Sequence, residues 1–270
     1  MISFFILRGI LERSIILSLL PASMHITARI IHFDDLTLEG AFGIGSGVMA
    51  LLLSHHYSLF FSLLGSIFAG ALSGLATAIL HTKFYLNPLI SGIITSTALF
   101  SITLKVAGAH IALPIKTAFF YNDISWIALV VFLTFFLAYL FLKTELGFLL
   151  YAVGDNQKLI IGLSKSPAQY QTIGLIIANA LVGLSGALFT YYLGYFSIWS
   201  NVGMLVVALA SLILAESMSN KFNFFLMAGS LLYQIIIAIT YSFHIDQDWN
   251  KLITASIVVI CIFIQKIFKR

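Results

Sequence analysis

Long apolar segments with very few charges are the feature that most constrains the fold of this chain. Of its 270 residues, 60% are hydrophobic and only 9% are charged, whereas soluble domains carry about 25% charged residues. A soluble fold of this length cannot bury so much apolar surface, so the bilayer must act as its solvent. The sequence therefore predicts an all-α protein, a polytopic transmembrane helical bundle.

A helix that crosses the bilayer needs about 20 mostly apolar residues. The eight segments that meet this requirement are 14–32, 58–80, 88–106, 124–142, 172–193, 202–218, 222–242 and 251–267. A further segment, 40–53, is short and rich in glycine. It either spans fully, which makes nine spans, or forms a broken, re-entrant helix. Broken helices are tolerated only where protein or a water-filled path surrounds them.

The distribution of basic residues favours eight spans, with 40–53 re-entrant and both termini in the cytoplasm. In this arrangement most lysines and arginines lie inside, as the positive-inside rule expects, while Arg29 lies outside. The nine-span alternative moves the N-terminus, Arg8 and Arg13 to the outside and brings Arg29 inside. In both arrangements 143–171 is cytoplasmic.

Composition also excludes several classes of protein. The formal net charge of +4 comes from basic residues spread thinly at membrane edges, so it does not indicate nucleic-acid binding. One cysteine, Cys261, excludes a disulfide framework and a cysteine-rich metal site, and the histidines are scattered. The loops 107–122 and 143–171 are too short to bury a core. We therefore expect one transmembrane domain over 1–270, without a metal or a cofactor.

One long polar segment interrupts the apolar ones, from Glu145 to Thr172, with the sequence ELGFLLYAVGDNQKLIIGLSKSPAQYQT. It predicts a short helix over 158–163, with Asp155 or Asn156 as its N-cap. The apolar face of this helix is formed by Leu159, Ile160 and Leu163. A membrane protein with such a segment usually engages a partner on the cytoplasmic side. The alternative is an ordinary amphipathic helix that lies on the lipid headgroups.

Acidic residues are rare in the apolar part of the chain, and their densest group is Asp34, Asp35 and Glu39. Acids at membrane depth are costly unless they face water or a partner, so one interpretation places this group at the mouth of a translocation path. The other interpretation is a solvated loop that caps the following helix. Asn179 lies inside a span, where an amide bonds a neighbouring helix or lines a path. All four are candidate path residues.

Two stretches of the chain resemble a known family. The first, 31–42, contains D-D-L-T-L-E-G, and the second, 146–156, ends in G-D-N. The second continues through A-N-A-L-V-G-L-S-G-A-L at 178–188 to Ala215-Glu216. Both resemble the membrane permeases of ABC importers, in the branched-chain amino-acid/ribose-type family. The most similar branch is the one associated with uptake of tryptophan or related amino acids.

This resemblance implies a permease subunit of a bacterial ATP-driven importer in the plasma (inner) membrane, with a path for a small solute such as an amino acid. The partners that it implies are cytoplasmic ABC ATPase subunits, an extracytoplasmic substrate-binding protein and a second permease, identical or different. The chain would then be no enzyme, because a separate subunit hydrolyses ATP. In such permeases the loop at 146–170 holds the coupling helix. The implied ATPase-coupling residues are Gly154, Asp155, Asn156, Leu159 and Leu163.

Two other classes of protein are alternatives to an ABC permease. An ion-coupled secondary transporter, acting without an ATPase, would typically show inverted repeats and charges within its spans, and neither stands out here. The residues G-L-S-G at 183–186 match a pattern of intramembrane serine proteases. A Ser–His pair would need a histidine at the depth of Ser185. The later histidine, His244, falls in an expected outer loop.

Overall fold

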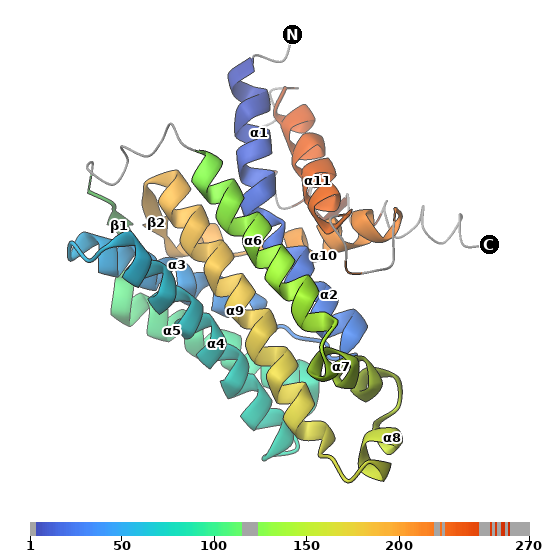
Figure 1. The fold of residues 1–270 in the computed structure, drawn as a ribbon. Coiled ribbons are helices and arrows are strands. Elements are labelled where there is room, and N and C mark those ends of the chain that lie inside the picture. Colours follow the sequence, from blue (N-terminus) through green and yellow to red (C-terminus); the bar gives the residue numbers. More distant parts are fainter. Residues whose placement is uncertain are drawn as a thin grey trace.

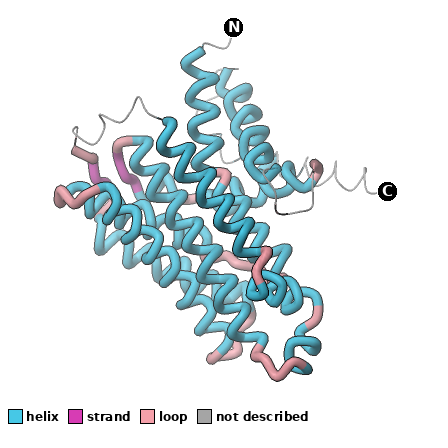
Figure 2. The backbone as a smooth tube through the Cα atoms, in the orientation of Figure 1, coloured by secondary structure: helices cyan, strands magenta, loops and turns pink. Residues whose placement is uncertain are grey.

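The computed structural model describes residues 4–114, 124–218, 222, 225–242, 249, 252, 255, 256 and 259. Within these residues helices dominate, and the prediction of an all-α bundle is confirmed (Figures 1 and 2). In this part of the chain five helical segments are long and apolar enough to cross a membrane, and 38–54 and 225–240 are shorter apolar helices. These features are those of a multi-pass membrane protein.

From residue 38 to residue 242 the helices follow the predicted apolar segments closely, whereas the expected span 14–32 is divided among three shorter helices. The α-helices are α1 (Phe4–Leu17), α2 (Leu19–His25), α3 (Leu38–Ser54), α4 (Leu59–Thr82), α5 (Pro88–Ala107), α6 (Ile124–Leu142), α7 (Glu145–Asp155), α8 (Gln157–Gly162), α9 (Pro167–Leu193), α10 (Met204–Glu216) and α11 (Phe225–Ser242). The other elements are a π-helix, η1 (Ile26–Ile30), a 3-10 helix, η3 (Ile198–Asn201), and the strands β1 (His110–Ala112) and β2 (Tyr195–Ser197). Most of the expected span 251–267 lies outside the described residues.

Helix α9 lies at the centre of the bundle. In its most apolar stretch 67% of the residues are buried, against 28–39% in the other four segments long enough to span. It packs against α2, α3 and α4. A Cβ on Gly183 of α9 would lie 3.0 Å from the Gly70 Cα of α4, and a Cβ on Gly45 of α3 would lie 2.6 Å from the Gly183 Cα. Glycine at these positions therefore lets three helix backbones approach closely.

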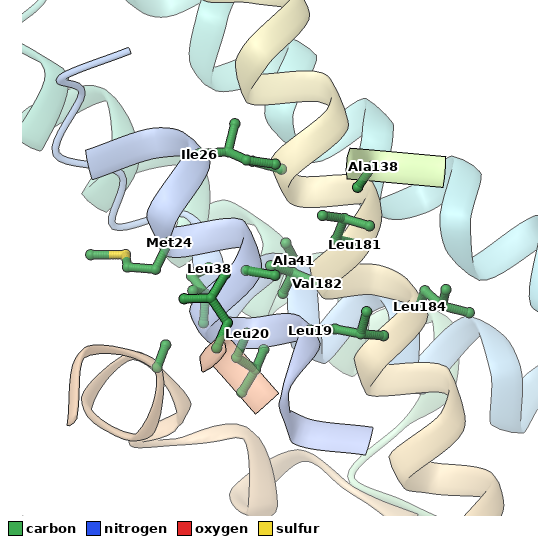
Figure 3. Packing of buried hydrophobic residues seen from close by; sticks show 14 of the residues in the cluster. Leu19, Leu20, Met24, Ile26, Leu38, Ala41, Ala138, Leu181, Val182 and Leu184 are labelled. Atoms are coloured by element: carbon green, nitrogen blue, oxygen red, sulfur yellow. The ribbon is translucent and has the colours of Figure 1, made fainter. Parts of the chain in front are cut away.

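The N-terminal helices belong to the core of the bundle. All seven residues of α2 are buried, and α2 packs against α9, α10 and α11. Figure 3 shows Leu20 of α2 in one cluster with Leu38 and Ala41 of α3 and with Val182 of α9. Removing the first helices would therefore expose the apolar faces of the central ones.

The helical path breaks at residues 31–37, before the glycine-rich segment and not within it. Helix α3 is continuous, and an extended stretch joins it to η1. Arg29 in η1 donates a hydrogen bond to Glu216 at the end of α10 (2.8 Å). The ring Nδ1 of His32 lies 2.8 Å from the carbonyl oxygen of Gly154 in α7. The break therefore begins at the end of the bundle that carries α7 and α8.

The chain thus passes through the bundle between Phe4 and Ile30 and returns through α3. Figure 1 shows the N-terminal end of α1 opposite to α7 and α8. The expectation that Arg29 lies on the side opposite to 143–171 is wrong, and the contacts fit the nine-span alternative over this part of the chain. Counting basic residues separates the two arrangements poorly, because Arg29 moves inward when the N-terminal arginines move outward. The number of spans after 242 stays a prediction.

The opposite end of the bundle carries a small two-stranded sheet. Strands β1 and β2 pair antiparallel, with Ile111 opposite Phe196. Phe196 is buried in a satellite cluster with Ala50, Ala107 and Ile198. This cluster holds η3 against α3 and α5, and it brings the chain just before α10 beside the first turns of α3.

Candidate functional site

The polar segment folds into two capped helices, α7 and α8. The hydroxyl oxygen of Thr144 accepts a hydrogen bond from the Gly147 N–H (3.4 Å), and the Asn156 side chain accepts one from the Lys158 N–H (3.1 Å). Asn156 therefore caps α8, as one of the two predicted alternatives, and Asp155 is the last residue of α7. Such caps satisfy backbone donors that a short helix otherwise leaves unpaired.

The apolar side chains of α8 divide between the bundle and the surface. Ile160 is fully buried, whereas Leu159, Ile161 and Leu163 are 52%, 62% and 56% exposed. We call these three residues the exposed α8 surface. The predicted apolar face of Leu159, Ile160 and Leu163 is therefore divided, because Ile160 directly follows Leu159 and adjacent residues of a helix do not share a face. Leu163 follows Gly162, the last residue of the helix.

The turn after α8 is tied back to the start of α7. The Lys165 N–H bonds to the Ile160 carbonyl oxygen (3.1 Å), and Lys165 Nζ lies 3.1 Å from Glu145 Oε1. The hydrogen bond to Glu145 raises the pKa of Lys165. Since the Glu145 side chain is 84% exposed, water screens this pair, which orients the turn more than it stabilises the fold.

Gly154, at the end of α7, touches the end of η1. A Cβ at this position would collide with the Ile30 carbonyl oxygen and lie 3.1 Å from His32 Nδ1. Because the Gly154 carbonyl can only accept, His32 must donate to it from Nδ1. His32 has a positive φ of 50°, a conformation that non-glycine residues adopt rarely. This contact was not predictable from the sequence, where His32 is one of several scattered histidines.

Replacing Gly154 with alanine is expected to separate α7 from η1. The added Cβ has no space, so the substitution should lower the free energy of unfolding by about 1–3 kcal/mol. Thermal unfolding of the purified protein in detergent measures this change. Gly162→Ala is the matched control, because nothing lies within 4 Å of a Cβ there. Equal melting temperatures for the two variants would contradict the close contact at Gly154.

Asp35 and Asn179, predicted separately as path residues, bond to each other inside the bundle. Asp35 Oδ2 accepts a hydrogen bond from Asn179 Nδ2 (2.7 Å), and Oδ1 accepts one from the Thr37 N–H (2.8 Å). The Thr37 hydroxyl lies 2.6 Å from the Thr77 hydroxyl of α4. The side chains of Asp35 and Asn179 are buried. Their bond joins the break to α9, and the contact between Thr37 and Thr77 joins it to α4. Asp34 is exposed, as the interpretation of a solvated loop expects, whereas Asp35 is buried.

Glu39 faces a pocket between α3, α5 and η3. Its Oε1 accepts a hydrogen bond from the Gly203 N–H (2.7 Å), just before α10. The same pocket is lined by Ser96, Phe100, Thr103, Asn201 and Val202. Glu39 was predictable as a candidate from the sequence, and these neighbours were not. They are ordinary residues of apolar segments, and only the packing of α3, α5 and η3 brings them together.

Ser185, the serine of the protease-like pattern, contributes to the packing of the bundle. It is fully buried in α9, and its hydroxyl donates a hydrogen bond to the Ile16 carbonyl oxygen of α1 (3.0 Å). Gly186 beside it lies against the Phe42 carbonyl oxygen of α3. Close helix packing therefore accounts for the small residues of this pattern.

Residues 6–262 match the family described as "Branched-chain amino acid transport system / permease component". The chain belongs to this permease family. It is similar to the tyrosine transport system permease protein of Clostridioides difficile (strain R20291), with 34% identity over 260 residues, 93% of this chain and 88% of the relative. It is also similar to an uncharacterised protein of Rickettsia prowazekii (strain Madrid E), with 29% identity over 259 residues, 90% and 91% of the two chains. No solved structure matches it significantly.

Membership of the family confirms the resemblance noted in the sequence and makes the chain a permease of the kind found in ABC transport systems. The two stretches that carry the resemblance also meet in space. The first forms the break and the start of α3, and the second forms α7 and the cap of α8. The bond between His32 and Gly154 joins them. In this permease, therefore, the polar segment is in direct contact with the break at 31–37.

Proposed function

We propose that this chain is the membrane-spanning subunit of a bacterial ATP-driven importer in the inner membrane, with 145–172 in the cytoplasm. Its partners are two cytoplasmic ABC ATPase subunits, an extracytoplasmic binding protein and a second permease subunit. The permease forms the path for a small solute, and the ATPase selects between its open and closed gates. ATP can bias these gates only by binding the two states of the complex with different affinities.

The observation that carries this proposal is the exposed α8 surface. Leu159, Ile161 and Leu163 are more than half exposed within a segment that also contains Lys158 and Lys165. Apolar side chains that cluster on a polar, capped element mark a surface that contacts a protein partner or the membrane, and we assign this one to a protein partner. In the proposed complex, this surface inserts into a groove of the ATPase, and Ile160 keeps α8 attached to the permease.

The contacts of α7 provide a mechanical connection from this surface to the centre of the bundle. A displacement of α8 would move α7, and the contact between Gly154 and His32 would transmit the movement to the break at 31–37. The break is held in place by two bonds: Asp35 bonds to Asn179 of α9, and the Thr37 hydroxyl bonds to the Thr77 hydroxyl of α4. A connection of this kind transmits a change only if its elements have two arrangements. We propose that the break at 31–37 is the part that moves between them.

The proposed substrate is an amino acid. The support is the name of the tyrosine transport permease of Clostridioides difficile, which is 34% identical to this chain. A binding protein would carry much of the selectivity, since it meets the solute first. The permease must then accept the solute that is delivered and release it to the cytoplasm.

The first experiment is purification of the tagged permease from its native membranes in mild detergent, followed by mass spectrometry. We expect a stoichiometric ATP-binding-cassette ATPase. A photo-crosslinking residue at Ile161 should attach to that ATPase. A clean preparation without an ATPase, together with attachment to lipid alone, would contradict the proposal and identify α8 as a helix on the headgroups.

Uptake in whole cells separates the proposal from an ion-coupled transporter. With labelled L-tyrosine as the probe, we expect uptake to continue after a protonophore collapses the proton gradient while ATP is held constant by glycolysis. Depletion of ATP at an intact gradient should stop it. The reverse pattern would identify a secondary transporter and overturn the role assigned to the ATPase.

A further inference from the structure

The pocket at Glu39 combines a carboxylate with two buried oxygens that have no partner. We propose that this pocket binds the ammonium group of the transported solute, an inference that rests on the proposed function. The pocket lies where α3, α5 and the segment before α10 meet. Three observations support the proposal: the charge of Glu39, the unpaired oxygens of Thr103 and Asn201, and the chemistry of the lining.

Glu39 has no cationic partner within the described part of the chain. The ion pairs found there join Arg8 to Glu12, Arg29 to Glu216 and Lys165 to Glu145. Glu39 instead lies in the first turn of α3 and accepts a hydrogen bond from Gly203, which precedes the first turn of α10. Two helix N-termini favour a negative charge at this point. They hold the carboxylate in place and leave its cation-binding capacity unused.

Thr103 and Asn201 each present a buried oxygen without a partner. Their side chains are 1% and 6% exposed, and no group in the described structure bonds to Thr103 Oγ1 or Asn201 Oδ1. On the same helix, the hydroxyl of Thr95 bonds to the carbonyl four residues earlier, at Ser91 (2.9 Å). Thr103 lacks this usual bond. Buried polar atoms without partners are costly, so a ligand that supplies donors would relieve the cost at both residues.

An ammonium group matches this set of atoms. It offers three N–H donors and a positive charge, and the residues that line the pocket include a carboxylic acid, an amide and an alcohol, namely Glu39, Asn201 and Thr103. The lining contains no lysine, arginine or histidine that could bind a carboxylate. The cavity volume is about 50 Å³, so it suits the ammonium end of a small solute. The rest of the solute would extend past Phe100 and Val202.

The competing explanation is purely structural: Glu39 holds the segment before α10, and nothing else binds. Glu39→Gln separates the two explanations, because glutamine retains an acceptor for the Gly203 N–H and loses the charge. Thr103→Val removes the unpaired hydroxyl with little change in shape. Thr95→Val, eight residues earlier on α5, is the matched control, since its hydroxyl bonds within its own helix.

The test measures how a thiol in the pocket reacts with two small reagents of opposite charge. Val202 lines the pocket and is 40% exposed, so Val202→Cys is introduced into the full-length permease after Cys261→Ser. The reagents are aminoethyl methanethiosulfonate, which carries a primary ammonium, and sulfonatoethyl methanethiosulfonate, which is an anion. We expect the ammonium reagent to react faster, and Glu39→Gln to reduce this preference about tenfold. Thr103→Val should reduce it less, and Thr95→Val should not reduce it.

Protection of the same thiol identifies the group that binds. Tyramine and L-tyrosine, which share an ammonium group, should slow the reaction, whereas 3-(4-hydroxyphenyl)propionate, which lacks it, should not. An unchanged reagent preference in Glu39→Gln would overturn the proposal. Protection by sodium chloride but not by choline chloride or tyramine would also overturn it, because the pocket would then be a metal-ion site.

These results stand apart from the test of the proposed function. Co-purification of the ATPase depends on α8, at the other end of the break, and should be the same in all pocket variants. A pocket without cation preference in a complex that retains its ATPase would contradict the ammonium site alone. Cation preference in a preparation without an ATPase would leave the site in place and contradict the ATP-driven mechanism.

Discussion

Leu159→Asp is expected to abolish co-purification of the ATPase while the permease stays folded. Leu159 is 52% exposed and is not part of the buried core, so the fold should tolerate the substitution. Within a complex, it would place a carboxylate in an apolar groove. The loss of such an anchor weakens binding by about 2 kcal/mol or more, roughly thirtyfold. The measurement is the ratio of ATPase to permease after affinity purification, with the elution volume of the permease as the test of folding.

Two control variants show that the effect belongs to the apolar surface. Leu159→Met keeps the side chain apolar and should retain the ATPase. Gln157→Asp adds the same charge to the first turn of α8, where an acid favours the helix, and it should retain the ATPase as well. Normal co-purification in Leu159→Asp, or equal loss in Gln157→Asp, would contradict docking through the exposed α8 surface.

The second large effect is expected at the bond between Asp35 and Asn179. Asn179→Leu leaves Asp35 Oδ2 without a donor at a position that is only 3% exposed. A buried carboxylate that loses the donor of one oxygen destabilises a fold by about 2–4 kcal/mol, although Oδ1 keeps its bond from the Thr37 N–H. The same loss should accompany Asp35→Leu, which leaves Asn179 Nδ2 with Leu175 as its one remaining partner. Thermal unfolding in detergent should show a clear decrease in melting temperature for both.

The double variant tests whether the two residues act as a pair. If they do, Asp35→Leu combined with Asn179→Leu should cost less than the sum of the single variants, because no carboxylate is left unpaired. Asp34→Asn is the control in the same loop. Asp34 is exposed, so its effect should stay within about 0.5 kcal/mol. Additive losses, or a large effect at Asp34, would show that the bond does not hold the break in place.

Helix positions were predictable from the sequence because each apolar segment has the length that a bilayer requires. The expected spans 88–106 and 124–142 reappear almost unchanged as α5 and α6. Asn156 marks a helix start through local chemistry, because its side chain supplies an acceptor for a backbone N–H of the first turn. These features depend on residues that are close in the chain, so no knowledge of the fold is needed to find them.

The direction of the first helices was not predictable in the same way. The continuous helix α3 and the contacts of Arg29 with Glu216 and of His32 with Gly154 decide it. Each of these contacts joins residues that are more than a hundred positions apart. Hydropathy shows which segments cross, but a difference of one or two basic residues is too small to orient them.

The candidate site shows the same division. The sequence identified apolar residues within the polar segment and polar residues within or beside apolar segments, namely Leu159, Leu163, Asp35, Glu39 and Asn179. Their partners were not, because Thr103, Asn201 and His32 are unremarkable where they stand in the chain. Burial also divided the predicted apolar face of α8: Ile160 lies inside the bundle, whereas Leu159 and Ile161 on either side of it are exposed.

By itself, the sequence determined that this permease is a helical membrane protein, which segments form its helices, and that one polar segment carries a short capped helix. These properties follow from local composition, from the thickness of the bilayer and from interactions between residues that are close in the chain. The tertiary structure alone decided which end of the bundle receives the break at 31–37, that Asp35 bonds to Asn179, and that Glu39 shares a pocket with Thr103 and Asn201. Helix packing brings these groups together, and glycines at the crossing of α3, α4 and α9 set how closely the helices approach.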